Sequence, residues 1–252
     1  RSRGIPKEET GLYALLDRHP GADGRGVRIA ILDTGCDLRA RGLDGTTSDG
    51  ATPKYLDFLD CTGDGDVATN KTVAFNATAS RTVAGLSGRD LTVGDWAEGV
   101  AEFKLGAVRL YDLLPRGVER RLQKERKEAF LAKHGALISE TQKSLDGLPS
   151  DGGDDKAAGK KSDAEKKELE LLLEQLQTIA ESYQDFSPLL DCLLFRSEEE
   201  GVWKAVVDVA ADGDLTRSVP LAPFGHARQT GELAFGSAVT FCVQVYEDGN
   251  VL

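Results

Sequence analysis

The sequence lacks methionine altogether, although a translated chain begins with that residue and this one begins Arg1-Ser2-Arg3. We therefore expect a processed N-terminus or a fragment of a longer protein. No apolar run approaches the roughly 20 residues that a membrane-spanning helix needs. Acidic residues number 42 and basic residues 31, so the net charge is −11. This balance argues against general nucleic-acid binding and against docking on an anionic membrane, since both depend on basic residues.

Cysteine is scarce, because the 252 residues hold only four. No two are close in sequence, which excludes a Cys-x-x-Cys zinc or redox motif. Their density is far below that of a disulfide scaffold, so we expect buried free thiols in a reducing compartment. The first 20 residues lack the apolar core of a signal peptide, and the cytoplasm is the predicted location. The cysteines are Cys36, Cys61, Cys192 and Cys242.

A short apolar run follows a glycine turn near the N-terminus. Gly24-Arg25-Gly26 precedes Val27, and residues 29–32 are continuously apolar. Such a run is typical of a strand that is buried on both faces, as in a parallel sheet. Residues 53–59 form a second strand candidate. Apolar runs between residues 67 and 111, such as 103–111, also indicate β-structure.

Two helical patterns occupy the middle of the chain. Residues 116–134 are rich in charge, and we interpret their net charge of about +4 as a solvated helix face rather than a nucleic-acid patch. Residues 164–183 carry apolar residues at helical spacing from Leu169 to Tyr183, which predicts an amphipathic helix packed in a core or an interface. Between these helices, residues 146–163 have almost no apolar side chains, so we predict a disordered linker.

Strand patterns return towards the end of the chain, at residues 189–195, 202–209 and 239–246. Asp212-Gly213 and Asp248-Gly249-Asn250 are turn signals. Two groups of aspartates could suggest calcium loops, but neither has the spacing of that motif, and we expect polar turns instead. We predict no metal and no cofactor. The two groups are Asp60, Asp64 and Asp66, and Asp208, Asp212 and Asp214.

The candidate for chemistry is Asp33, which directly follows the predicted strand 29–32. Active sites of open α/β sheets lie at the carboxyl ends of strands. An aspartate held there could orient a histidine and stabilise its charged form, or it could simply cap the next turn. Aspartic peptidases also use Asp-Thr-Gly, but they pair two such aspartates, and no second motif in a matching context is present.

The longer segment from Gly24 to Asp37 resembles the aspartate motif of the subtilisin-like serine peptidases, with Cys36 where Val or Ile is usual. This resemblance implies that Asp33 is the acid of a Ser-His-Asp triad and that Thr34, Gly35 and Asp37 support the motif. The histidine and serine motifs of the family are absent. His134 and His226, which follow Asp33, lack the expected context, and we interpret them as solvated or packed side chains.

Further segments resemble the tripeptidyl peptidase II branch of this family, in which a long insertion separates the aspartate from the histidine. The resemblance implies an α/β fold: the start of a subtilisin-like parallel-sheet catalytic domain, followed by a mixed α+β insertion. We expect residues 1–60 to begin the catalytic domain, 61–236 to form the insertion and 237–252 to return towards the catalytic domain. The histidine motif is then expected shortly after Leu252, and the chain is interpreted as an N-terminal fragment. The matching segments are Pro6–Gly11, Val83–Arg89, Gln123–Glu128, Asp191–Leu193, Val202–Ala205, Asp212–Leu215 and Tyr246–Asn250.

By this resemblance, the complete enzyme removes tripeptides from the free N-termini of oligopeptides in the cytoplasm. Its expected partners are oligopeptide substrates and further copies of itself in a large homo-oligomer, with no nucleic acid and no membrane. The fragment alone is predicted to be inactive, because its nucleophile and base are absent. The competing interpretation is a non-catalytic scaffold or pseudo-peptidase that keeps only the aspartate segment.

Overall fold

The structure is a computed structural model that describes residues 6–43, 45–47, 49–148, 156–234 and 239–252. The chain divides into two compact units, Arg1–Asp37 and Leu38–Leu252, and each is described by itself. Among its described residues the first unit contains one helix, α1 (Leu12–Arg18). The catalytic-domain boundary that we place near residue 60 stays a prediction.

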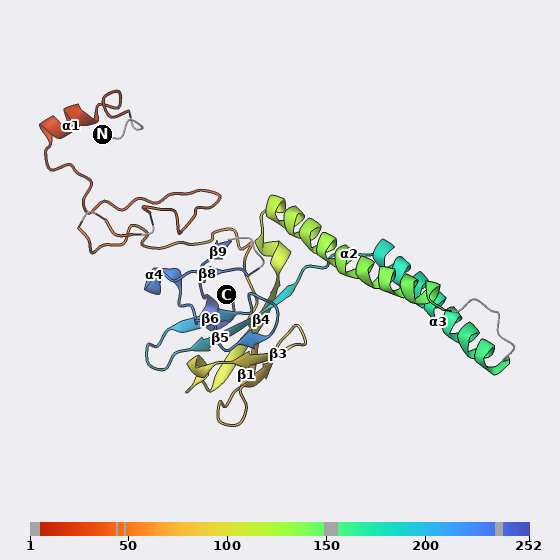
Figure 1. The fold of residues 1–252 in the computed structure, drawn as a ribbon. Coiled ribbons are helices and arrows are strands. Elements are labelled where there is room, and N and C mark those ends of the chain that lie inside the picture. The colour runs from red at the N-terminus through yellow and green to blue at the C-terminus, as the bar shows by residue number, and fades with distance from the viewer. Residues whose placement is uncertain (1–5, 44, 48, 149–155, 235–238) are drawn as a thin grey trace. The chain divides into compact units, whose positions relative to one another are not determined.

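The second unit is built around a four-stranded antiparallel sheet with the strand order β1-β4-β5-β6 (Figure 1). Its central strand β5 is buried on both faces, because every residue from Leu190 to Phe195 is buried. The strands predicted at 103–111, 189–195 and 202–209 are thereby confirmed, with small shifts of their ends. The four strands are β1 (Lys71–Ala74), β4 (Glu102–Arg109), β5 (Leu189–Arg196) and β6 (Trp203–Val207).

A smaller sheet of β2 (Thr82–Ala84), β3 (Asp90–Val93) and β7 (Asp214–Leu215) contributes to one core. Here β2 and β3 pair antiparallel, whereas β3 and β7 pair parallel. Side chains of the two sheets pack together, and Trp96 stacks on Phe195 with ring centroids 5.7 Å apart. This core buries aliphatic and aromatic residues from both sheets: Leu91, Val93, Phe103, Leu105, Leu193, Phe195, Val206 and Leu215.

The remaining short elements complete the second unit. Strands β8 (Gly231–Glu232) and β9 (Thr240–Phe241) form a two-stranded antiparallel sheet, and α4 (Phe224–Ala227) precedes them. Residues 239–246, predicted as one strand, are therefore mostly irregular, because only β9 pairs within a sheet. Three 3₁₀ turns lie at Asp95–Ala97, Leu110–Leu113 and Glu247–Gly249.

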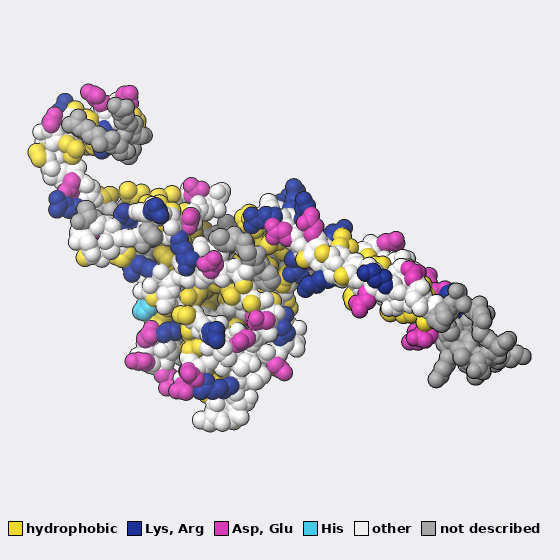
Figure 2. Space-filling model, viewed as in Figure 1, with side chains coloured by type: hydrophobic (Ala, Val, Ile, Leu, Met, Phe, Trp, Pro, Cys, Tyr) yellow, Lys and Arg dark blue, Asp and Glu magenta, His cyan; other side chains and the backbone are white. Residues whose placement is uncertain are grey.

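The helices α2 (Arg116–Asp146) and α3 (Lys156–Glu181) pack side by side (Figure 1). Both predicted helices are confirmed, and charged side chains of both signs cover much of their visible surface (Figure 2). The predicted linker 146–163 lies partly outside the described residues, but its residues 156–163 belong to α3. Alanine and lysine, which make up five of these eight residues, are strong helix formers, so these turns can extend a helix that is packed farther along.

The predicted parallel sheet at the start of the chain is not found among the described residues. Residues 29–32 form no strand, with Ile29 80% and Leu32 95% exposed. The second candidate, 53–59, contributes only an isolated bridge between Pro53 and Thr46. A strand that is buried on both faces needs paired neighbours and covering layers, and none of the described residues supplies them for 29–32.

Candidate functional site

The geometry around Asp33 is set by its own neighbour. The Thr34 backbone N–H donates to Asp33 Oδ1 over 2.6 Å, and Thr34 Oγ1 donates to the same oxygen over 3.3 Å. These are the hydrogen bonds of Asp33 among the described residues, so its Oδ2 accepts none of them. The side chain of Asp33 is exposed. One carboxylate oxygen is thus fixed by the motif, and the other is open to a donor.

The glycine turn before this segment is a local structure. Gly24 and Gly26 have φ angles of 83° and 77°, in the left-handed region that favours glycine. The Arg25 backbone N–H donates to Asp23 Oδ1 over 3.0 Å, and Arg25 Nε lies 2.6 Å from Asp23 Oδ2. These hydrogen bonds, led by the one from the Arg25 backbone, lower the pKa of Asp23. The turn is therefore held by its own backbone geometry and by the Asp23 carboxylate.

The other predicted motif residues lie in the same exposed segment. Gly35 has a φ of 149°, and Thr34 and Asp37 are exposed like Asp33. Cys36, at the motif position usually held by Val or Ile, is also exposed, and so is Cys61. The expectation of buried thiols is therefore wrong for these two cysteines, while Cys192 is buried. The Cys36 side chain lacks the sheet neighbours that would cover it among the described residues.

The two histidines that follow Asp33 have different surroundings. His134 is buried between α2 and α3, where its Nε2–H donates to the Leu176 carbonyl over 2.6 Å. Its ring also stacks on Phe130 with centroids 5.0 Å apart. His226 is exposed in α4. The interpretation of these histidines as packed and solvated is confirmed.

The aspartate groups considered as calcium loops form polar turns instead. Asp60 Oδ1 accepts the Thr62 backbone N–H and hydroxyl, and this lowers the pKa of Asp60. Asp208 accepts the backbone N–H groups of Asp212 and Gly213. No cluster of three potential His, Cys, Asp or Glu metal ligands occurs within the described ranges. These turns agree with the sequence expectation.

A buried polar cluster that the sequence pattern did not predict joins the two larger sheets. Asp191, in the middle of β5 and 1% exposed, accepts the backbone N–H of Ser87 over 2.9 Å and also the Ser87 hydroxyl. Arg89 Nη2 lies 3.3 Å from the same carboxylate, and Arg89 Nε lies 3.5 Å from the buried Asp208. The partners are about a hundred residues apart, so no local spacing could reveal them. The only hint was an aspartate inside an otherwise apolar strand.

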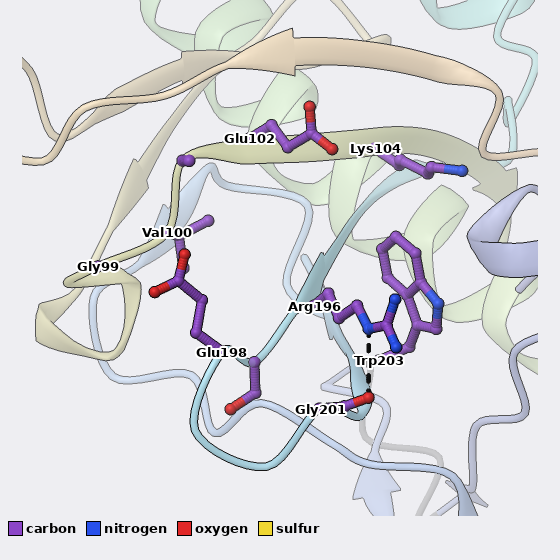
Figure 3. A pocket seen from close by; sticks show the side chains of 10 residues that line it. Gly99, Val100, Glu102, Lys104, Arg196, Glu198, Gly201 and Trp203 are labelled. Carbon is purple, nitrogen blue, oxygen red and sulfur yellow. Dashed lines mark hydrogen bonds between the residues drawn. The ribbon is translucent and has the colours of Figure 1, made fainter.

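An open cavity of about 480 Å³ lies beside the β5–β6 hairpin (Figure 3). Glu102 and Lys104 from β4 face it, as do Arg196, Glu198 and Trp203 from the hairpin. Arg196 Nε donates to the Gly201 carbonyl over 3.2 Å, which stabilises the hairpin. The lining includes the Ser197 hydroxyl, but among the described residues this hydroxyl has no hydrogen bond to a base, so the cavity does not resemble an active site.

Comparison with known proteins gives a consistent result along the chain. No protein-family model matches. The tripeptidyl-peptidase 2 of Oryza sativa subsp. japonica is 36% identical over 259 residues, and that of Arabidopsis thaliana is 31% identical over 255 residues. Each match covers 98% of this chain and 18% of the relative. The tripeptidyl-peptidase 2 of Drosophila melanogaster is 30% identical over 255 residues.

A solved structure supports the same assignment. A crystal structure of tripeptidyl peptidase 2 matches with a TM-score of 0.57 and 27% sequence identity, covering 96% of this chain and 18% of that one. The mixed α/β fold described above is therefore shared with that protein. Over 98% of its length the chain is similar to tripeptidyl-peptidase 2, and it spans 18% of the length of its plant relatives.

Proposed function

We propose that this chain forms part of a serine peptidase that removes tripeptides from the free N-termini of oligopeptides. The observation that carries the proposal is the match to tripeptidyl-peptidase 2 over 98% of the chain, including the Asp33 segment. Asp33 is assigned as the triad acid, and Thr34, Gly35 and Asp37 as the residues that support its loop. The histidine and the serine then come from parts of the complete protein outside these 252 residues.

The local geometry around Asp33 supports this role. In a Ser-His-Asp triad the aspartate accepts the Nδ1–H of the histidine, which sets the imidazole tautomer and stabilises the imidazolium. Thr34 already donates twice to Oδ1, so this oxygen is held in place. The open Oδ2 is the atom that can accept the imidazole N–H. The histidine, oriented in this way, would act as the base for the attacking serine.

The proposal also includes the substrates, the location, the assembly and the domain boundaries. We assign oligopeptides as substrates, the cytoplasm as location and self-association into a large homo-oligomer as the state of the complete protein. Residues 1–60 are assigned to the catalytic domain, 61–236 to an insertion and 237–252 to the return towards the catalytic domain. No described helix combines the length and the apolar character that crossing a membrane requires.

The test is Asp33→Asn in the complete protein. We expect kcat to fall about 10⁴-fold, because the amide favours the wrong imidazole tautomer, while KM for a tripeptide-releasing substrate stays within a few fold. The control is Asp17→Asn, which makes the same change on the exposed helix α1 and should leave kcat unaltered. Unchanged turnover of Asp33→Asn would show that Asp33 is structural.

The alternatives make different forecasts for the unaltered complete protein. A serine peptidase loses activity to a serine-directed phosphonylating reagent, whereas an aspartic peptidase using Asp33 does not. A scaffold or pseudo-peptidase releases no tripeptide at all. The 252 residues by themselves should also release none, since they contain neither the nucleophile nor the base. Tripeptide release from this chain alone would contradict the assignment.

A further inference from the structure

The turn at Glu247–Asn250 has an unfavourable backbone conformation. Glu247, Asp248 and Gly249 have φ angles of 50°, 51° and 79°. Only glycine adopts this left-handed region without a steric cost, so two of the three residues are strained. Strain of this kind persists only where surrounding contacts over-determine the conformation, and it is concentrated at functional sites. The contacts that hold this turn in its strained conformation therefore indicate its role.

Lys104 provides two of these contacts from β4. Its Nζ donates to the Asp248 carbonyl over 2.7 Å and to Asn250 Oδ1 over 2.8 Å. The same ammonium lies 5.2 Å from the centroid of the Trp203 ring, and the two side chains are seen together in Figure 3. Hydrogen bonds from a charged donor are stronger than those between neutral groups. Lys104 thus holds the Asp248 carbonyl and the Asn250 side chain of the strained turn.

Trp203 and Thr69 contact the middle of the turn. Trp203 Nε1 donates to Asp248 Oδ1 over 3.2 Å, and the indole packs so closely on Gly249 that a Cβ there would lie 2.8 Å from the nearest ring atom. Thr69 is fully buried, and its hydroxyl donates to the Gly249 carbonyl over 2.8 Å. Residue 249 must therefore be glycine for two reasons, its φ angle and this close packing.

The residues after the turn are held by backbone hydrogen bonds. The Thr69 N–H donates to the Asn250 carbonyl over 2.8 Å. Val67 and Leu252 exchange two further bonds of 2.8 and 3.0 Å. Residues 250–252 are thus held against residues 67–69, and the preceding turn determines the position of residue 250.

We propose that Lys104 and Trp203 are positioning residues of the peptidase. Together with Thr69 they form a clamp on the Glu247–Asn250 turn, and through residues 250–252 they orient the segment that leads to the triad histidine. This inference rests on the proposed function and on the expectation that the histidine motif follows Leu252. The four-stranded sheet of the insertion then has a role in catalysis, because β4 and β6 each supply one clamp residue.

The first test is Lys104→Met in the complete protein, which keeps the apolar stem and removes the hydrogen-bond donors. We expect kcat to fall at least about 10-fold with KM within twofold, because small misplacements of a catalytic group slow the reaction strongly. Lys104→Arg, which restores the charge and the donors, should recover most of the turnover. The matched control is Lys71→Met on β1, an exposed lysine expected to leave kcat within twofold.

The second measurement separates positioning from general stability. In Lys104→Met and in Trp203→Phe, the amides of Val67, Thr69 and Leu252 should exchange hydrogen faster, while those of β5 keep their protection. Unchanged kcat in Lys104→Met, or loss of protection in β5, overturns the inference. If Asp33→Asn is inactive and Lys104→Met is fully active, only this inference fails. If Asp33→Asn is fully active, the proposed function fails as well.

Discussion

The cysteine thiols of this chain differ in reactivity because their burial differs. Cys192 lies in β5 with its side chain removed from solvent, whereas Cys36 and Cys61 are exposed. Burial, assisted by the neighbouring charges of Asp191 and Asp208, raises the pKa of the Cys192 thiol to about 12. A thiolate is the reactive form of cysteine, so Cys192 is inert in the folded protein.

Thiol labelling tests this difference. At pH 8, iodoacetamide should modify Cys36 and Cys61 within minutes and leave Cys192 unmodified until the protein is unfolded in guanidinium, as read by peptide mass spectrometry. The folded pKa is raised from 9.0, so this thiol's contribution to stability is present below pH 9 and is lost as the pH rises towards 12. Labelling of Cys192 at the rate of Cys61 would contradict the burial.

At the residue scale, a sequence pattern can indicate contacts whose cause is local. The segment Gly24–Asp37 pointed to Asp33, and its hydrogen bonds with the neighbouring Thr34 need no distant partner, while the triad role of Asp33 stays a prediction. The cluster of Ser87, Arg89 and Asp191 was missed, because tertiary packing brings its members together across about a hundred residues. An aspartate in a buried strand is a warning of such a cluster, but its partners can be identified only in three dimensions.

At the scale of elements, an aromatic stack joins α2 to the segment that directly follows α3. The Phe130 ring lies 5.0 Å from the ring of His134 and 4.4 Å from that of Tyr183. Near the same end, Asp185 accepts from Tyr111 Oη and from Arg126 Nε. Burial and then the Asp185 carboxylate raise the pKa of Tyr111. These contacts connect the helices to the end of β4.

Phe130→Ala should therefore weaken the helix pair. We expect the free energy of unfolding to fall by about 2–3 kcal/mol, since the substitution removes a partly buried ring and two stacking contacts. The measurement is urea denaturation followed by circular dichroism. Phe186→Ala is the matched control, because that ring is 76% exposed, and it should cost less than about 0.5 kcal/mol. Equal losses in the two variants would show that the stack does not stabilise the helices.

Periodicity predicted these elements well, but it could not say what they pack against. The apolar stripe from Leu169 to Tyr183 identified α3, yet only part of it faces α2, and Leu172 and Ile179 remain 42% and 49% exposed. The run 29–32 has the composition of a buried strand but forms none here, because a strand depends on partners that its own sequence does not contain. Helices satisfy their backbone hydrogen bonds internally and are easier to predict for that reason.

At the scale of the whole molecule, the unit Arg1–Asp37 is notable for apolar side chains that are left exposed to solvent. The side chains of Val27, Ile29 and Ile31 are 66%, 80% and 79% exposed, a combination seldom left in water by a folded domain. The relatives are far longer than this chain, which spans 18% of the plant proteins. If residues 1–60 begin a parallel-sheet domain, as proposed, neighbouring strands of the complete protein cover this run.

Limited proteolysis tests whether residues 29–32, which are exposed in the 252-residue chain, are covered in the complete protein. In the 252-residue chain, trypsin should cut first after Arg25 and Arg28, where the backbone is exposed and forms no sheet. In the complete protein, the bond after Arg28 should resist cleavage, because a central strand cannot enter a protease active site. The measurement is a time course of peptides by mass spectrometry.

A paired substitution sharpens this test. Ile31→Asp should leave the 252-residue chain as stable as before, since the side chain is 79% exposed there. In the complete protein the same change places a charge in a buried strand, which is strongly unfavourable, and it should restore cleavage after Arg28. Ile31→Val, which suits a strand, should keep the protection. Equally fast cleavage after Arg28 in both unaltered proteins would mean that residues 29–32 are exposed in the complete protein too, and the parallel-sheet assignment of residues 1–60 would then be wrong.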